Sequence, residues 1–96
     1  MRPSEALKTH REAVLAIAAG MGMRNVRVFG SVLHGEDAEG SDVDLLVDAP
    51  EGTSLLDMVR LQAAIENQLG VSVDVLTAGD LPPRVRARVL QEAKPL

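Results

Sequence analysis

Three short apolar runs, separated by longer amphipathic segments, place the strongest constraint on how this chain folds. The runs are residues 25–29, 43–47 and 71–76, and each is bounded by glycine or by polar residues. Short runs rich in valine and leucine are typical of β-strands when they have such boundaries. The segments around them carry apolar residues at helical spacing. The sequence therefore predicts an α/β fold with the element order α-β-β-α-β-α.

The helical segments have recognisable ends. We expect the first helix to run from an N-cap at Ser4 to Gly20. We expect the second to be capped by the Thr53-Ser54 pair and closed by Gly70, and the last to span 84–94 after two prolines. In the second helix we expect an inward-facing apolar stripe that consists of Leu55, Met58, Val59, Ile65 and Leu69.

Some polar residues in the helices allow more than one interpretation. Gln62 and Glu66 lie inside the stripe and mark either a partner surface or an open edge of the helix, because a fully buried Glu needs pairing. His10 lies on the first helix, three residues after Leu7 and four before Val14, and we expect it to be a boundary residue and not a ligand. Arg84 and Arg88 share a helix face, which we interpret as solvated rather than as a contact for nucleotide phosphates or an acidic partner.

The lengths of the connections predict which strands are parallel. The link between the first two strands is too short for a crossover helix, so we expect an antiparallel pair. The long helix between the second and third strands permits a parallel pair. The predicted fold class is thus a small mixed sheet of three to four strands flanked by helices. A chain of 96 residues leaves room for one such domain, over 1–96, and for no second core.

Composition excludes several classes of function. The chain has one Phe, no Trp and no Tyr, so it lacks the aromatic platform on which single-strand nucleic-acid binders stack bases. Its net charge of −4 disfavours duplex DNA as a partner, and the absence of Cys excludes thiolate chemistry. We find no signal-peptide pattern and no apolar run long enough for a bilayer. We therefore expect a cytoplasmic protein without membrane or nucleic-acid partners.

Acidic residues gather in the middle of the chain. No Lys or Arg occurs between Val28 and Val59, and such a run is usually a solvated loop. Asp42 and Asp44 by themselves fit an exposed strand end as well as a metal site, and Asp74 decides for the metal. Residues i and i+2 of a strand point to the same face, where two carboxylates repel each other unless a cation lies between them. Asp74 is disfavoured in the apolar third strand unless it completes that site. Hard oxygen ligands of this kind suit Mg²⁺.

Gly30 and Ser31 follow the first strand and are a candidate site for a phosphate. Glycine lets the backbone approach a ligand closely, and the turn after it can direct N–H groups at phosphate oxygens. An acidic pocket holds a phosphate only if Mg²⁺ bridges it to the carboxylates, and two ions would stabilise both oxygens of an in-line displacement. We expect Asp42 and Asp44 to bind both ions. We expect Asp74 to bind one ion and to accept the proton of an attacking hydroxyl.

The run Gly30–Asp44 reads Gly-Ser, three residues, Gly, five residues, Ser-Asp-Val-Asp, which resembles the signature of the polymerase-beta-type nucleotidyltransferase superfamily. The small size is similar to the minimal nucleotidyltransferase family, many of whose members are antitoxins paired with a HEPN toxin. The resemblance implies a polymerase-beta-like fold and Mg²⁺-dependent transfer of AMP from ATP to a tyrosine hydroxyl of the toxin. The nucleotide-binding residues that it implies are Gly30, Ser31, His34, Gly35 and Ser41.

His34 departs from the family pattern, in which an Arg commonly precedes the second glycine. Histidine keeps a donor near the phosphates, but its charge depends on pH, which bears on NTP affinity or turnover. Two alternatives stay open: an inactive antitoxin that acts by occlusion, and a transferase for a small molecule, for which 96 residues leave little room. With so few aromatic residues, we expect a bound base to rest on aliphatic side chains and backbone.

Overall fold

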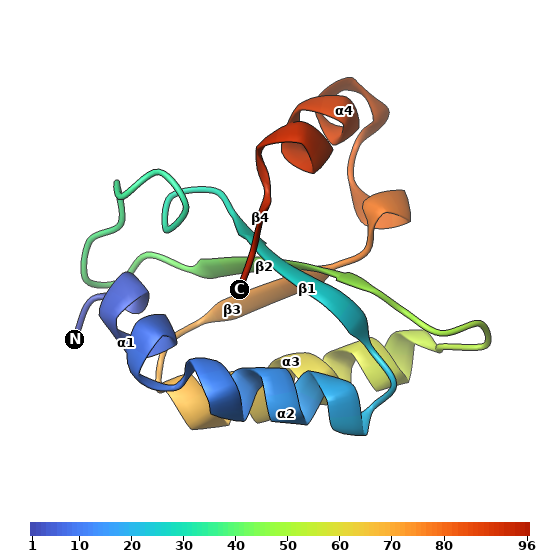
Figure 1. Cartoon of the computed structure of the whole chain (residues 1–96), viewed down its shortest axis with the longest axis horizontal. Coiled ribbons are helices and arrows are strands. Elements are labelled where there is room, and N and C mark those ends of the chain that lie inside the picture. The colour runs from blue at the N-terminus through green and yellow to red at the C-terminus, as the bar shows by residue number, and fades with distance from the viewer.

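The computed structural model describes residues 1–96 and consists of four α-helices and a four-stranded sheet (Figure 1). The elements in chain order are α1 (Pro3–Thr9), α2 (Arg11–Gly20), β1 (Arg24–Phe29), β2 (Val43–Asp48), α3 (Leu55–Leu69), β3 (Val73–Leu76), the 3₁₀ helix η1 (Ala78–Asp80), α4 (Pro83–Glu92) and β4 (Lys94–Pro95). The predicted α/β class is confirmed. None of the helices has the length and apolarity that a membrane span requires.

The sheet is mixed, with the strand order β3-β2-β1-β4. β1 runs antiparallel to β2, and β2 runs parallel to β3, as the connection lengths predict. β4 pairs antiparallel with β1. The last helix, α4, ends before it at Glu92, two residues earlier than expected. β3 begins at Val73 rather than at Val71, and the Ser72 carbonyl just before it accepts a hydrogen bond from Val43 N of β2.

The sheet separates an aliphatic core from the face that carries the acidic residues. α1, α2 and α3 lie on one face of the sheet and α4 lies on the other (Figure 1). The core on the three-helix face consists of Ala6, Leu7, Val14, Ala18, Met23, Val26, Val43, Leu45, Val47, Leu61, Ile65, Leu69, Val73 and Val75. Because side chains alternate along a strand, Asp44 and Asp74 belong to the opposite face, where α4 lies.

The first helix is in fact two helices. His10 was expected within the first helix, but it is the C-cap of α1 and the N-cap of α2. Its Nδ1 lies 3.2 Å from Gln68 Nε2. The expectation of one continuous helix with Ser4 as N-cap was wrong. Arg2 is the N-cap, Pro3 takes the first helical position, and the Ser4 N–H donates to the Asp37 carboxylate instead.

α3 has the predicted caps, but its apolar stripe is narrower than predicted. Ser54 Oγ accepts a hydrogen bond from Asp57 N, and Gly70 closes the helix with φ +72°. Leu55 and Val59 are 82% and 55% exposed, so their expected inward placement was wrong. Leu55 and Val59 lie on the same side of α3 as Gln62 and Glu66, because the four residues are three or four positions apart. This side of the helix follows the free edge of the short strand β3 and does not cover the sheet.

Gln62 and Glu66 cover this free edge of β3. Glu66 Oε2 accepts from Val73 N at 2.9 Å, and Gln62 Oε1 accepts from Val75 N at 3.4 Å. The N–H groups of an edge strand can otherwise pair with another chain. The two polar side chains inside the apolar stripe therefore belong to the fold itself.

Replacing Glu66 by Leu is expected to lower the free energy of unfolding by about 1 kcal/mol, because the Val73 N–H loses its acceptor. Urea denaturation followed by circular dichroism measures this change. Glu66→Gln retains an acceptor oxygen and should be close to wild type, as should Asn67→Leu at the exposed next position. A Glu66→Leu variant as stable as the wild type would show that the edge bond contributes nothing.

Candidate active site

Gly30 and Asp44 meet where β1 ends and β2 begins. Gly30 has φ +74°, a left-handed conformation that favours glycine. A Cβ at this position would collide with Asp44 Oδ2. Asp44 is also the direct register partner of Phe29, the last residue of β1. Both the backbone conformation and the space at position 30 therefore require glycine. Because Gly30 has no side chain, the Asp44 carboxylate can lie against it.

The predicted carboxylates share one face of the sheet. Asp44 and Asp74 are direct partners on the parallel strands β2 and β3, and Asp42 precedes Asp44 by two residues. Asp44 is half-buried, whereas Asp42 and Asp74 are exposed. Burial, followed by the charges of Asp74 and Asp42, raises the pKa of Asp44 to about 6. The structure thus places Asp42 and Asp74 close enough to Asp44 for their charges to raise its pKa.

The donor set matches the chemistry of a hard divalent cation. A cation among these carboxylates would remove their repulsion and offset the desolvation of Asp44. In the metal-free protein, no group of three His, Cys, Asp or Glu side chains has the arrangement of a complete set of metal ligands. The residues fit Mg²⁺ by type and by shared face, and the carboxylates must draw together to bind it.

A tight turn follows Gly30. His34 N donates to Gly30 O at 3.3 Å, Gly35 N to Val32 O at 3.3 Å, and Glu36 N to Ser31 O at 2.9 Å. The N–H groups at the start of the turn, from Ser31 to Leu33, donate none of these bonds. They are therefore the ones that the turn leaves for a ligand.

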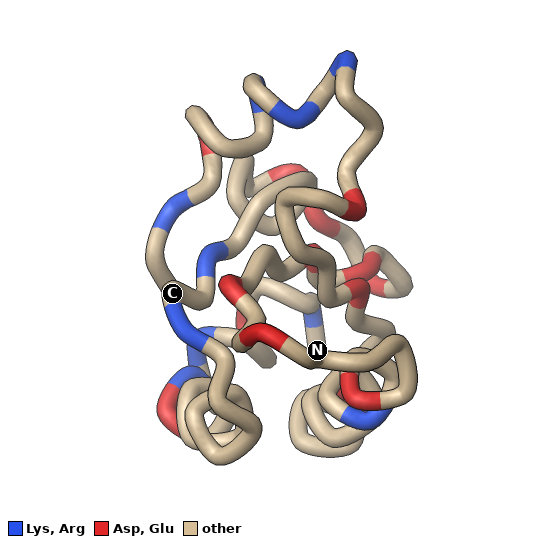
Figure 2. Tube along the Cα trace, turned by 90° about the vertical axis from the view of Figure 1, so that its right-hand side faces the viewer, with Lys and Arg blue, Asp and Glu red and all other residues tan.

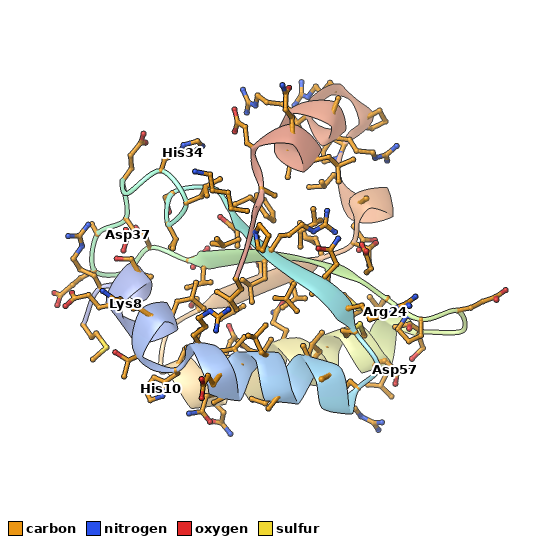
Figure 3. All side chains as sticks on the ribbon, viewed as in Figure 1. Lys8, His10, Arg24, His34, Asp37 and Asp57 are labelled. Atoms are coloured by element: carbon orange, nitrogen blue, oxygen red, sulfur yellow. The ribbon has the colours of Figure 1, made fainter.

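His34 and Ser41 connect this turn to the rest of the chain. His34 Nε2 lies 3.3 Å from Glu92 Oε2 of α4, so this side chain connects the turn to the helix. Figure 3 labels His34 on the turn. Ser41 Oγ accepts from Ala38 N at 3.0 Å and closes the loop that enters β2. His34 and Ser41 thus each already have a partner within the chain.

Asp37 holds that loop, and its role could not be inferred from the sequence. Its side chain is fully buried beside the start of α1 (Figure 3). The Ser4 N–H donates to its Oδ2 at 2.9 Å, and Arg2 Nη2 donates to its main-chain oxygen at 2.8 Å. The Ser4 hydrogen bond, with a further contribution from the Arg2 charge, lowers the pKa of Asp37 below its ordinary value. The loop that delivers Asp42 is thereby anchored to α1.

Replacing Asp37 by Ala is expected to lower the midpoint of thermal unfolding by several degrees at neutral pH. Because the pKa of Asp37 is lower in the folded protein than in the unfolded chain, its carboxylate stabilises the fold at pH values above the ordinary Asp pKa. This stabilisation disappears as the pH falls through the pKa that Asp37 has in the folded protein. The difference between variant and wild type should therefore shrink in acid. Calorimetry at neutral and acidic pH measures it, with Glu39→Ala, an exposed partner of the N-terminus, as a near-neutral control. A difference that is independent of pH would contradict this assignment.

A cleft of about 310 Å³ opens beside Gly30 under α4. Its lining consists of Phe29, Gly30, His34, Leu81, Val85, Arg88, Val89 and Glu92. A larger cleft of about 490 Å³ lies around 47–53 and 77–80, but it contains none of the predicted site residues. Val85 and Val89 are half-buried and line the cleft. Arg84 and Arg88 are both exposed, as expected, but Arg88 also borders the cleft.

Arg86 attaches α4 to the turn before it. Its Nε donates to Ala78 O at 2.8 Å, and its Nη2 donates to Leu81 O at 2.9 Å. Figure 2 shows the basic residues of α4 at one end of the molecule and the acidic residues in the body beneath them. The helix thus brings positive charge to the same side of the sheet as the carboxylates.

Comparison with known proteins agrees with this geometry. Residues 7–96 match the family model of the nucleotidyltransferase domain. The chain belongs to the nucleotidyltransferase family. A solved structure described as a candidate minimal nucleotidyltransferase is 53% identical to this nucleotidyltransferase, with a TM-score of 0.86 over 97% of this chain and 95% of that chain. The enzyme class and the polymerase-beta-like fold expected from the sequence are confirmed.

Relatives of the nucleotidyltransferase carry a more specific name. The protein adenylyltransferase MntA of Thermococcus cleftensis is 42% identical over 71 residues, which are 74% of this chain and 72% of that protein. A Methanocaldococcus jannaschii protein described as a candidate protein adenylyltransferase is 41% identical over 83 residues, 86% of this chain and 89% of that one. A toxin–antitoxin structure with AMP-PNP, at 17% identity, shares the fold with a TM-score of 0.76 over 88% of this chain and 69% of that chain.

Proposed function

We propose that residues 1–96 form one catalytic domain that transfers AMP from ATP to a hydroxyl of a partner protein. The observation that carries this proposal is the shared face of Asp42, Asp44 and Asp74 beside the Gly30 turn. The relatives described as protein adenylyltransferases support a protein as the acceptor. The fold neighbour from a toxin–antitoxin structure supports an antitoxin role. We propose a HEPN-type toxin as the partner and a tyrosine hydroxyl as the acceptor.

The chemistry follows from the placement of the side chains. Asp42, Asp44 and Asp74 would hold Mg²⁺, in our proposal two ions, which when bound neutralises charge on the triphosphate and on the departing pyrophosphate. The acceptor oxygen attacks the α-phosphorus, the bond from that phosphorus to the bridging oxygen breaks, and pyrophosphate leaves. Asp74 is exposed and accepts the proton of the acceptor hydroxyl.

The turn after β1 holds the phosphates in this scheme. The free N–H groups at its start and the Ser31 hydroxyl donate to phosphate oxygens. His34 adds a ring donor, Gly35 lets the turn close with φ +68°, and Ser41 fixes the loop that leads to Asp42. Each of these residues acts on binding and orientation.

Mg²⁺ binding is expected to weaken as the pH falls below about 6, because Asp44 is then protonated in the metal-free protein. One proton displaced per ion gives a loss of affinity of up to about tenfold per pH unit. Titration calorimetry with Mg²⁺ between about pH 5 and pH 7 measures this dependence. In Asp44→Asn the affinity should be low and much less dependent on pH. A wild-type affinity that stays constant down to pH 5 would remove Asp44 from the proposed ligands.

A second candidate function is neutralisation of the toxin by occlusion alone. His34 in place of the family's Arg favours it. Incubation with ATP, Mg²⁺ and the product of the neighbouring reading frame separates the two functions. Our proposal predicts that the intact mass of the partner rises by one or more AMP groups. Toxin inhibition without any gain in mass would instead support occlusion.

A further inference from the structure

We infer that the cleft under α4 holds the nucleoside part of the substrate, with the base against Phe29 and with Arg88 at the rim. This inference rests on the proposed nucleotidyl transfer and deepens it. In the proposed function, the carboxylates bind the metal and the Gly30 turn binds the phosphates, but none of these residues binds the nucleoside. The cleft supplies that place from residues outside the motif.

The position of the cleft is the first support. It begins at Gly30, the residue that contacts the Asp44 carboxylate. Phe29 lines the cleft and is the register partner of Asp44 across the two strands, so both residues belong to the same face of the sheet. The α-phosphate is bonded directly to the nucleoside, so a phosphate at Asp44 brings the nucleoside beside Gly30. The other clefts border none of these residues.

The chemistry of the wall is the second support. Phe29, Leu81, Val85 and Val89 provide apolar surface, and the volume of about 310 Å³ lies at the lower end of the range for small-molecule sites. Phe29 is the only aromatic residue of the chain, and an aromatic ring is a surface on which any base can stack. In this inference the base rests on this one ring in addition to the aliphatic side chains expected from the composition.

The charge at the rim is the third support. Arg88 is the one Lys or Arg in the lining, it is exposed, and the ion pairs of the chain are made by other residues. Arg86, two positions earlier, is committed to backbone carbonyls. Across the cleft His34 lies against Glu92. An uncommitted guanidinium thus borders the cleft, where it can donate to acceptor atoms of a base or ribose.

Two ligands separate the nucleoside from the phosphates. ATP and inorganic tripolyphosphate, each with Mg²⁺, are titrated into the protein in a calorimeter. We expect Phe29→Leu, which keeps apolar bulk but removes the ring, and Arg88→Gln each to weaken ATP binding about tenfold. Neither change should affect tripolyphosphate. The matched control is Arg84→Gln, one turn earlier on α4 and outside the cleft, which should change neither affinity.

Each other outcome overturns the inference in a distinguishable way. ATP binding that both variants leave unchanged contradicts the nucleoside site alone and leaves the proposed transfer intact. Equal weakening of ATP and tripolyphosphate places Arg88 on the phosphates and contradicts the assigned position. A wild-type protein that binds neither ligand contradicts the proposed function itself, and the inference falls with it. Arg88→Gln alters an exposed side chain, so it tests the site even if Phe29→Leu disturbs β1.

Discussion

Replacing Asp44 by Asn is expected to reduce nucleotidyl transfer on the order of 10³-fold or more. Asp44 is the centre of the site, because it pairs with Asp74 across the parallel strands and contacts Gly30 at the start of the turn. The amide has nearly the same shape but lacks the negative charge that holds a divalent cation. The initial rate of AMP incorporation into the partner at saturating Mg²⁺ measures the loss.

The same substitution is expected to leave the fold intact or to stabilise it. The folded protein raises the pKa of Asp44 to about 6, so the ionised form, which still predominates at neutral pH, costs free energy in the metal-free protein. Asn removes that unfavourable charge, and because the residue is only half-buried the gain is about 1 kcal/mol after solvent screening. Asp48→Asn, at the exposed far end of β2, is the matched control and should retain transfer. Loss of folding in Asp44→Asn would contradict this account.

Replacing Gly30 by Ala is expected to damage both stability and transfer. The left-handed φ of +74° costs an L-residue about 1–3 kcal/mol, and the added Cβ collides with the Asp44 carboxylate. The carboxylate must then leave its place, and a displacement of about 1 Å can reduce a rate about 100-fold. Urea denaturation and the rate of AMP incorporation measure the two effects on one preparation.

Gly52 provides the matched control for this prediction. It has φ +85°, and a Cβ added there meets no atom within 4 Å. Gly52→Ala should therefore show the backbone cost without a loss of transfer. If Gly30→Ala and Gly52→Ala had the same effect on transfer, the contact between Gly30 and Asp44 would have no catalytic importance.

Local patterns were sufficient to predict most of the fold. The strands over 25–29 and 43–47 and the capped helix ending at Gly70 depend on neighbouring residues, and the structure has them at these places within a residue or two. The two-residue strand β4 could not be predicted, because its only signal is its pairing with β1. Leu55 and Val59 were placed inward because the sequence does not show how little of α3 the short strand β3 covers.

The candidate site divides in the same way. The shared face of Asp42 and Asp44 follows from alternation along one strand, but the pairing of Asp44 with Asp74 depends on the register of two strands. Asp37 could not be found, because its partner Arg2 lies 35 residues away in sequence. Arg88 borders the site only because α4 lies over the acidic face, which no local pattern determines.

The position of the label in ATP tests the central claim most directly. The protein is incubated with Mg²⁺ and the product of the neighbouring reading frame, once with ATP labelled in the α-phosphate and once with ATP labelled in the γ-phosphate. Our account predicts that the partner acquires only the α-label, that the γ-label appears in pyrophosphate, and that Asp44→Asn transfers neither. Incorporation of the γ-label, or α-label transfer that survives Asp44→Asn, would contradict it.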